Sequence, residues 1–302
     1  MAARVLVLGG EGMLGHKMWQ RLSQRFPDTY VTLFNDPTKR PLSDIDLFAG
    51  PRVIGQIDAR EAARLYALFA ELDPTVVVNC IGVIKQRPEA HDAIPSITLN
   101  SLLPHQLAHM GEQLRFRVIH FSTDCVFDGK RGGYTETDPS DAEDLYGKTK
   151  FLGEVATPNA VTLRTSIIGR ELFAHTGLLD WFLSQRGKRV KGYRRVLYSG
   201  VTTNHLAEVV GDLIERHPQI SGLYQVVSQT ISKHDLLCLI RDAMSLNIEI
   251  QPDDEVVSDR SMKGDKFRKA TGYVCPPWPE LVAQLGNDPT PYDEWEKRHA
   301  VP

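Results

Sequence analysis

Short apolar runs alternate with longer segments of helical spacing along the first half of the chain. Val5–Leu8 is apolar throughout, which is typical of a parallel strand buried on both faces. Large apolar residues recur every three or four positions over residues 14–26, which predicts an amphipathic helix. Further strands are predicted at residues 30–34, 53–57, 75–81, 116–121 and 160–163, and further helices at 62–72, 99–114 and 146–155. This strict alternation favours the α/β class with a parallel, doubly wound sheet.

The strict alternation of predicted strands and helices ends at residue 165. Helices are predicted at residues 178–185, 204–216 and 234–244, and a strand at 223–227. Residues 186–195 are rich in Lys and Arg and are predicted to form a loop, as are the polar, proline-flanked residues 37–51. Residues 252–302 carry seven of the 18 prolines and predict a smaller, irregular lobe.

Composition narrows the classes of protein that remain. Of the 302 residues, 42% are hydrophobic and 24% are charged, which argues against long disordered segments. The net charge of −3, without a basic face, argues against nucleic acid or a membrane surface as a partner. No apolar run approaches the roughly 18 residues that span a bilayer, so a cytoplasmic location is expected.

Metal sites and disulfides are not expected. The four cysteines lie far apart and form no C-x-x-C pair, so reduced thiols are predicted. His105 and His109 have the spacing of a helical metal pair, but the Glu of an H-E-x-x-H motif is missing between them.

A glycine-rich turn joins the first predicted strand to the first helix. Gly10, Gly12 and Gly15 fit G-x-G-x-x-G, and Gly9, Gly12 and Gly15 fit G-x-x-G-x-x-G. The second register is favoured because the strand ends at Gly9. Such a turn lets the backbone and the helix N-terminus approach a pyrophosphate, so a Rossmann-type dinucleotide site is predicted. The alternative is a tight turn that serves only close packing of strand and helix.

The residues that read the adenosine ribose are expected about twenty positions further on. Asn35 and Asp36 lie there, followed by Lys39 and Arg40. An acid favours NAD(H) and a base favours NADP(H), so the sequence leaves both cofactors open. Each of these four residues also fits a solvated loop.

Tyr146 and Lys150 are four positions apart in a predicted helix and therefore share one face. A Lys ammonium beside a phenol is expected to lower the pKa of the phenol, which favours Tyr146 as general acid. Thr123 ends a predicted strand at the edge where ligands of parallel sheets bind. The alternative is a surface Tyr packed on a Lys stem.

At this point the chain resembles the extended short-chain dehydrogenase/reductases, and more narrowly the dTDP-4-dehydrorhamnose reductase family. The resemblance is most specific at residues 122–124 (STD), 126–129 (VFDG) and 146–150 (YGKTK). It extends over nearly the whole chain, through residues 9–16, 57–60, 76–79, 100–108, 163–166, 222–224 and 265–267.

The resemblance implies hydride transfer from NAD(P)H to the C4 ketone of a nucleotide-linked 4-keto-6-deoxy sugar. Its implied catalytic residues are Thr123, Tyr146 and Lys150. Its implied cofactor-binding residues are Gly9, Gly12, Met13, Leu14, Gly15, Asn35, Asp58, Ala59, Cys80, Ile81, Gly82, Asn100, Tyr146 and Lys150. The substrate-binding residues taken from it are Lys85, Thr123, Asp124, Cys125 and Arg260, with a solvated loop as the alternative for Lys85.

Three stretches depart from the family pattern. Cys125 stands where an aromatic residue is usual, Ile167 where Trp is frequent, and the segment after Asn79 lacks the usual Ala, Thr and Asp. Two other functions therefore stay open: a nucleotide-sugar epimerase or dehydratase on the same fold, and a non-catalytic regulatory subunit.

The predicted organisation follows from these features. Residues 1–165 are expected to form a dinucleotide-binding domain, to which residues 196–227 return. Residues 166–195 and 228–302 are expected to form a smaller C-terminal substrate-binding lobe. A homodimer is a further expectation from the family.

Overall fold

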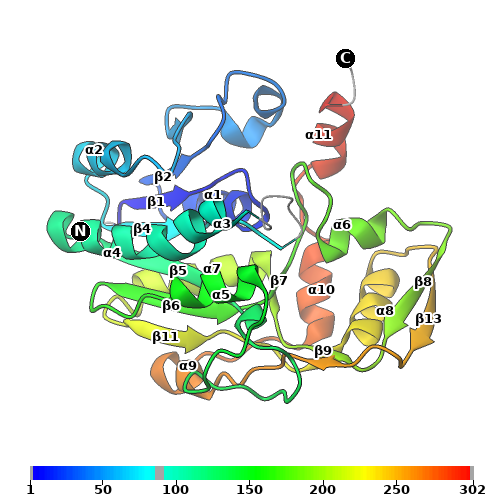
Figure 1. The fold of residues 1–302 in the computed structure, drawn as a ribbon. Helices are drawn as coiled ribbons and strands as arrows, with labels where there is room; N and C mark the ends of the chain where they lie inside the picture. Colours follow the sequence, from blue (N-terminus) through cyan, green and yellow to red (C-terminus); the bar gives the residue numbers. More distant parts are fainter. Residues whose placement is uncertain (1–2, 86–91, 300–302) are drawn as a thin grey trace.

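The computed structural model describes residues 3–85 and 92–299 (Figure 1). A parallel sheet of seven strands lies at its centre, in the order β11-β6-β5-β4-β1-β2-β3. The chain leaves β1 in one direction and returns at β4 to continue in the other, which confirms the predicted Rossmann-type doubly wound fold. The strands are β1 (Val5–Leu8), β2 (Thr29–Thr32), β3 (Val53–Ile54), β4 (Val76–Asn79), β5 (Arg117–Thr123), β6 (Ala160–Thr165) and β11 (Gly222–Gln225).

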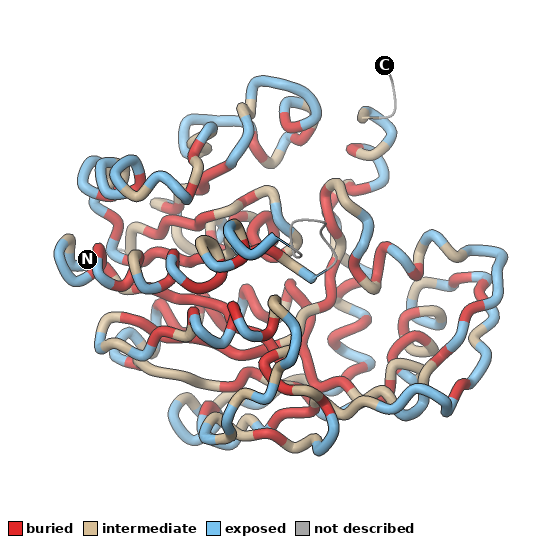
Figure 2. Tube along the Cα trace, viewed as in Figure 1, coloured by how far each residue is buried: buried red, intermediate tan, exposed pale blue. Residues whose placement is uncertain are grey.

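Helices cover both faces of the sheet. The apolar sides of α1 (Met13–Arg25) and α7 (Thr203–Glu215) share one buried cluster with one face of the strands. Those of α2 (Ala62–Leu72) and α4 (Leu103–Leu114) share a second cluster with the other face. The central strands β1, β4 and β6 are accordingly buried along their length, while the helices expose their outer sides (Figure 2). Within the described residues, no helix has the length and apolar character needed to cross a bilayer.

The loop after β2 was predicted to be polar, but part of it packs into the hydrophobic core. It contains two short 3₁₀ turns, η1 (Leu42–Asp44) and η2 (Asp46–Phe48). Leu42, Ile45 and Phe48 are buried in the same cluster as α1. Three apolar residues at a spacing of three therefore anchor this loop to the molecule.

The prediction of a loop at residues 186–195 is wrong over its centre. Arg189–Tyr193 forms β8, which pairs in parallel with β13 (Glu249–Asp253). Arg189 and Lys191 point outward to Glu249 and Asp253, while Val190 is buried. Exposed and buried residues alternate along β8 with a period of two, which is typical of a strand. The exposed cations made this stretch of the sequence resemble a basic loop.

The prediction of an irregular C-terminal segment is also wrong. It forms β14 (Ser258–Asp259) and three helices, α9 (Asp265–Thr271), α10 (Trp278–Gly286) and α11 (Tyr292–His299). Pro279 does not interrupt α10, because it lies in the first turn, where a missing N–H costs nothing.

The remaining elements lie beyond residue 165. They are β7 (Ile167–Ile168), α6 (Leu178–Leu183), β9 (Val196–Tyr198), β10 (Val201–Thr202), β12 (Ile231–Ser232) and α8 (Lys233–Ala243). α8 and α10 share a separate buried cluster with α6. The boundaries assigned to the two domains from the sequence stay a prediction.

Candidate active site

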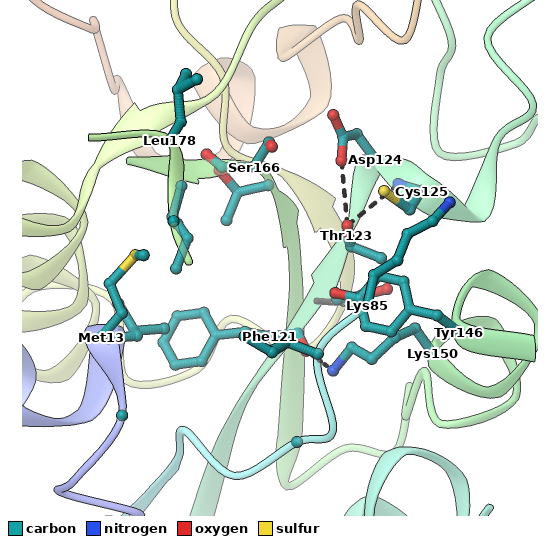
Figure 3. Close-up of a pocket in the computed structure, with 18 of the residues that line it drawn as sticks. Met13, Lys85, Phe121, Thr123, Asp124, Cys125, Tyr146, Lys150, Ser166 and Leu178 are labelled. Carbon is teal, nitrogen blue, oxygen red and sulfur yellow. Dashed lines mark hydrogen bonds between the residues drawn. The ribbon is translucent and has the colours of Figure 1, made fainter. Parts of the chain in front are cut away.

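A cavity of about 500 Å³ opens at the carboxyl ends of the central strands. One wall comes from the loops after β1, β4 and β5, and the other from segments beyond residue 165 (Figure 3). Open α/β sheets bind their ligands at this edge, where the strand order reverses. The predicted site residues that line it are Gly12, Met13, Leu14, Cys80, Ile81, Gly82, Lys85, Thr123, Asp124, Cys125, Tyr146, Lys150 and Arg260.

Glycines shape the turn from β1 into α1. Gly9 has φ +81°, in the left-handed region that side chains rarely adopt, and a Cβ on Gly15 would overlap the Gly9 carbonyl. Gly12 is the N-cap of α1, so the amide groups of the first turn face the cavity without a side chain over them. Gly9 and Gly15 support this turn from behind. An open helix N-terminus of this kind suits the pyrophosphate of a dinucleotide.

A buried asparagine holds the loop after β4. Asn100 accepts a hydrogen bond from the Val83 N–H at 2.9 Å and donates one to the Val83 carbonyl at 3.0 Å. It belongs to η4 (Ile97–Leu102), a π-helical segment that joins α3 (Ala93–Ser96) to α4, so this helical stretch begins earlier than predicted. Asn100 therefore positions the wall of the cavity from behind, without lining it.

The three predicted catalytic side chains come from two neighbouring elements. Thr123 ends β5, and Tyr146 and Lys150 lie on α5 (Leu145–Leu152). Asp144 caps this helix by accepting from the Gly147 N–H at 2.8 Å. The cap fixes the start of the helix, so both side chains face the cavity (Figure 3).

The predicted effect of Lys150 on Tyr146 is wrong in this structure. Burial raises the pKa of the Tyr146 phenol above its usual value, and a hydrogen bond with Thr123 offsets this only in part. The Lys150 ammonium donates to the Phe121 carbonyl at 2.6 Å, and burial lowers its pKa to about 8. The phenol is therefore protonated at neutral pH, which is the state that a general acid requires.

Thr123 is the centre of a small hydrogen-bond network. Its hydroxyl donates to the Asp124 carboxylate at 3.1 Å and accepts from the Cys125 N–H at 3.1 Å (Figure 3). Burial raises the pKa of Asp124, and it raises the pKa of the Cys125 thiol to about 12. Cys125 is therefore a neutral, weakly reactive group beside the phenol.

Cationic side chains surround the outer part of the cavity. Lys85 pairs with Asp144 at 2.6 Å and is half exposed. Arg260 donates to the Phe127 carbonyl at 2.8 Å, which fixes its guanidinium at the wall. Lys233, at the start of α8, was missed by the sequence analysis. No local motif marks it, because only the packing of α8 brings it to the site.

The remaining predicted cofactor residues lie elsewhere. A second cavity of about 520 Å³ at the end of β2 is lined by Asn35, Asp36, Lys39, Arg40 and Asp58, among others. Asn35 donates to the Glu11 carboxylate through its backbone and side-chain amides, both at 2.8 Å. Ala59 is buried in the core beside α2. The structure therefore divides the predicted cofactor residues between two cavities and their supports.

The sheet order, with a glycine turn at the point of reversal, defines a Rossmann-type α/β protein. A model of the RmlD substrate binding domain matches residues 3–285. The chain therefore belongs to the dTDP-4-dehydrorhamnose reductase family, which confirms the resemblance seen in the sequence. Membership places it among the NAD(P)-dependent oxidoreductases.

Individual relatives differ in their described roles. The chain is 28% identical, over 73% of its length and 70% of the relative's, to a probable dTDP-4,6-dihydroxy-2-methyloxan-3-one 4-ketoreductase of Streptomyces antibioticus. It is 26% identical, over 80% of its length and 72% of the relative's, to the mouse methionine adenosyltransferase 2 subunit beta.

Solved structures share the fold. A dTDP-4-dehydrorhamnose reductase from Bacillus anthracis, solved in complex with NADP, matches with a TM-score of 0.75. The match covers 94% of this chain and 98% of that one at 18% identity.

Proposed function

We propose that the protein reduces the C4 ketone of a nucleotide-linked 4-keto-6-deoxy sugar with NADPH or NADH. The observation that carries this proposal is the meeting of Thr123, Tyr146 and Lys150 with the glycine turn in one cavity. The family and the 4-ketoreductase relative support it.

The residues present fit a nicotinamide dinucleotide. The uncovered helix N-terminus at Gly12 would hold the pyrophosphate, and the cavity at the end of β2 would hold the adenosine part. A Cβ on Gly82 would approach the Asn100 side chain at 3.0 Å, so the glycine lets this wall of the cavity pack closely on Asn100. The bound cofactor supplies the hydride, and the chain supplies position and a proton.

In the proposed reaction Tyr146 donates its phenolic proton to the oxygen of the ketone. Thr123 holds the same oxygen, for which its hydroxyl turns away from Asp124. Lys150 lines the same cavity one helical turn from Tyr146, and its ammonium would turn from the Phe121 carbonyl to stabilise the negative charge left on the phenol. The protein then regains the proton from solvent.

The substrate diphosphate would meet the three cations at the outer part of the cavity, Lys85, Lys233 and Arg260. Cys125 and Ile167 would lie near the sugar, where their small size compared with the family's aromatic residues widens the site. A homodimer and a cytoplasmic location stay predictions, as does the assignment of substrate binding to residues 166–195 and 228–302.

A second candidate is a non-catalytic regulatory subunit. It is favoured by the 26% identity to the methionine adenosyltransferase 2 subunit beta. The intact trio of Thr123, Tyr146 and Lys150 favours catalysis instead. An epimerase or dehydratase is the weaker alternative, because a dehydratase needs an acid and a base after the Thr and this chain has Asp124 followed by Cys125.

The test is an assay of NADPH and NADH oxidation with dTDP-4-keto-6-deoxy sugars. We expect turnover by the native protein, and a loss in kcat of about 10²-fold or more in Tyr146→Phe, with the Kd for the cofactor unchanged. Cofactor binding without turnover across the sugars would instead support the regulatory subunit. Equal turnover by Tyr146→Phe would remove Tyr146 from its assigned role.

A further inference from the structure

The C-terminal residues 288–299, called the strap below, pack across the dinucleotide side of the molecule (Figure 1). They comprise α11 and the short segment before it. The family match ends at residue 285, so the strap lies outside the part shared with the family model. It contacts two segments that border the proposed cofactor site.

The first contact reaches the glycine turn. The Tyr292 hydroxyl lies 2.7 Å from His16 Nε2, and His16 Nδ1 lies 2.9 Å from the Gly12 carbonyl. A carbonyl only accepts, so Nδ1 carries the proton and donates to Gly12. Burial lowers the pKa of His16 to about 3, so the ring is neutral and Nε2 accepts from Tyr292. Tyr292 thereby fixes the ring that holds the N-cap of α1.

Buried polar contacts anchor the strap beside the hydrogen bonds that link Tyr292 through His16 to Gly12. Lys17, on α1, pairs with Asp288 at 2.6 Å and donates to the Thr290 hydroxyl at 3.0 Å. Both charged side chains are almost completely buried. Trp295 adds apolar contact in the cluster shared with α1. The strap is therefore a fixed part of the fold at this point.

The second contact reaches the loop after β2. Arg298 donates to the Asp44 carbonyl at 3.1 Å and pairs with the Asp46 carboxylate at 3.2 Å. Arg40 donates to the Arg298 carbonyl at 3.1 Å. Arg40 and Leu42 of the same loop line the cavity at the end of β2. One helix thus touches the supports of both cavities.

We propose that the strap is a positioning element for the dinucleotide, with Tyr292 setting the glycine turn and Arg298 setting the loop that borders the adenosine side. This rests on the proposed cofactor binding. Tyr292 and Arg298 act through His16 and through residues 40–46, and neither lines either of the two cavities. Pre-organised supports of this kind reduce the cost of binding.

The test compares Tyr292→Phe, Arg298→Gln and the double variant with the native protein. For each single variant we expect the Kd and KM for NADPH to rise about tenfold, since Tyr292→Phe loses the hydrogen bond to His16 and Arg298→Gln loses the contacts to Asp44 and Asp46. We expect kcat at saturating NADPH to stay within about twofold, because the reacting groups are untouched. The double variant should bind more weakly than either single variant.

Tyr66→Phe is the matched control, because it removes a hydroxyl from an exposed tyrosine on α2. It should leave the Kd and kcat unchanged. A lower Tm with an unchanged Kd for NADPH would make the strap merely structural and overturn the proposal. Should Tyr292→Phe not fold, an unchanged Kd in Arg298→Gln would also overturn it. Failure of the native protein to bind either NADPH or NADH would contradict the proposed function instead.

Discussion

Lys150 combines a charge with nearly complete burial. Its ammonium donates to a backbone carbonyl at 2.6 Å, and burial lowers its pKa from 10.5 to about 8. The residue type and the spacing to Tyr146 were evident from the sequence. The direction in which the ammonium points was not, because it depends on where the Phe121 carbonyl emerges from β5. The prediction for the Tyr146 pKa was wrong chiefly because the phenol itself is buried, which raises its pKa.

The lowered pKa of Lys150 predicts that activity falls and stability rises as the pH increases. Above about pH 8 Lys150 loses its charge, so kcat/KM for reduction should fall. Between about pH 8 and 10.5 the native state holds fewer protons at Lys150 than the unfolded state. The contribution of Lys150 to the free energy of unfolding should therefore rise with pH in that window.

A pH–rate profile from pH 6 to 10 tests the prediction, with denaturant unfolding at the same pH values. Lys150→Arg should remove the alkaline limb of whatever activity remains, since a guanidinium keeps its proton. An alkaline limb at the same pH in Lys150→Arg would assign it to another group.

At the scale of elements, α5 depends on the residue that caps it. Asp144 accepts from the Gly147 N–H and also pairs with Lys85. The start of this helix was predicted to within one residue, at 146, but its end was placed at 155, three residues beyond Leu152. β8 was missed, because its outward cations resemble a basic loop until their partners on β13 are known.

Two substitutions separate the two roles of Asp144. Asp144→Ala removes the cap and should lower the free energy of unfolding by about 1 kcal/mol. It should also lower kcat, because the first turn that carries Tyr146 frays. Asp144→Asn keeps the cap but removes the charge beside Lys85, so it should retain stability and kcat.

Denaturant unfolding and steady-state kinetics of both variants give the answer. Equal losses in Asp144→Ala and Asp144→Asn would show that the ion pair, and not the cap, positions the helix.

At the scale of the whole molecule, the cavity lies between the loops of the central sheet and segments beyond residue 165. The parallel, doubly wound sheet and its ligand-binding edge followed from the alternation of strands and helices, whereas the order of the strands comes from the structure. Arg260 of the far wall was expected from the family resemblance, but Lys233 and Tyr198 were missed, since they reach the cavity only through packing. The strap was beyond prediction for the same reason, because Tyr292 and His16 are 276 residues apart in sequence.

The two walls of the cavity are proposed to bind different ligands, NADPH and the substrate nucleotide. Each ligand should therefore raise the thermal stability separately. NADPH at about 100 times its Kd should stabilise the native protein by about 2.7 kcal/mol, and dTDP should add a further increase in Tm. Lys233→Ala should weaken dTDP binding about fivefold and leave the NADPH shift unchanged, because Lys233 belongs to the far wall. Thermal scans with each ligand alone and with both measure this. Loss of the NADPH shift in Lys233→Ala would contradict the division of the cavity.

The two ends of the described chain have different surroundings (Figure 1). The chain enters β1 at the amino edge of the sheet, opposite the cavity, whereas α11 ends beside the loop after β2. A purification tag or fluorescent fusion placed ahead of β1 is kept clear of the cofactor side by the length of the strands. The same fusion placed after α11 would pull on the helix that carries Arg298. Biosensors and immobilised forms of this protein are therefore better built from the amino-terminal side.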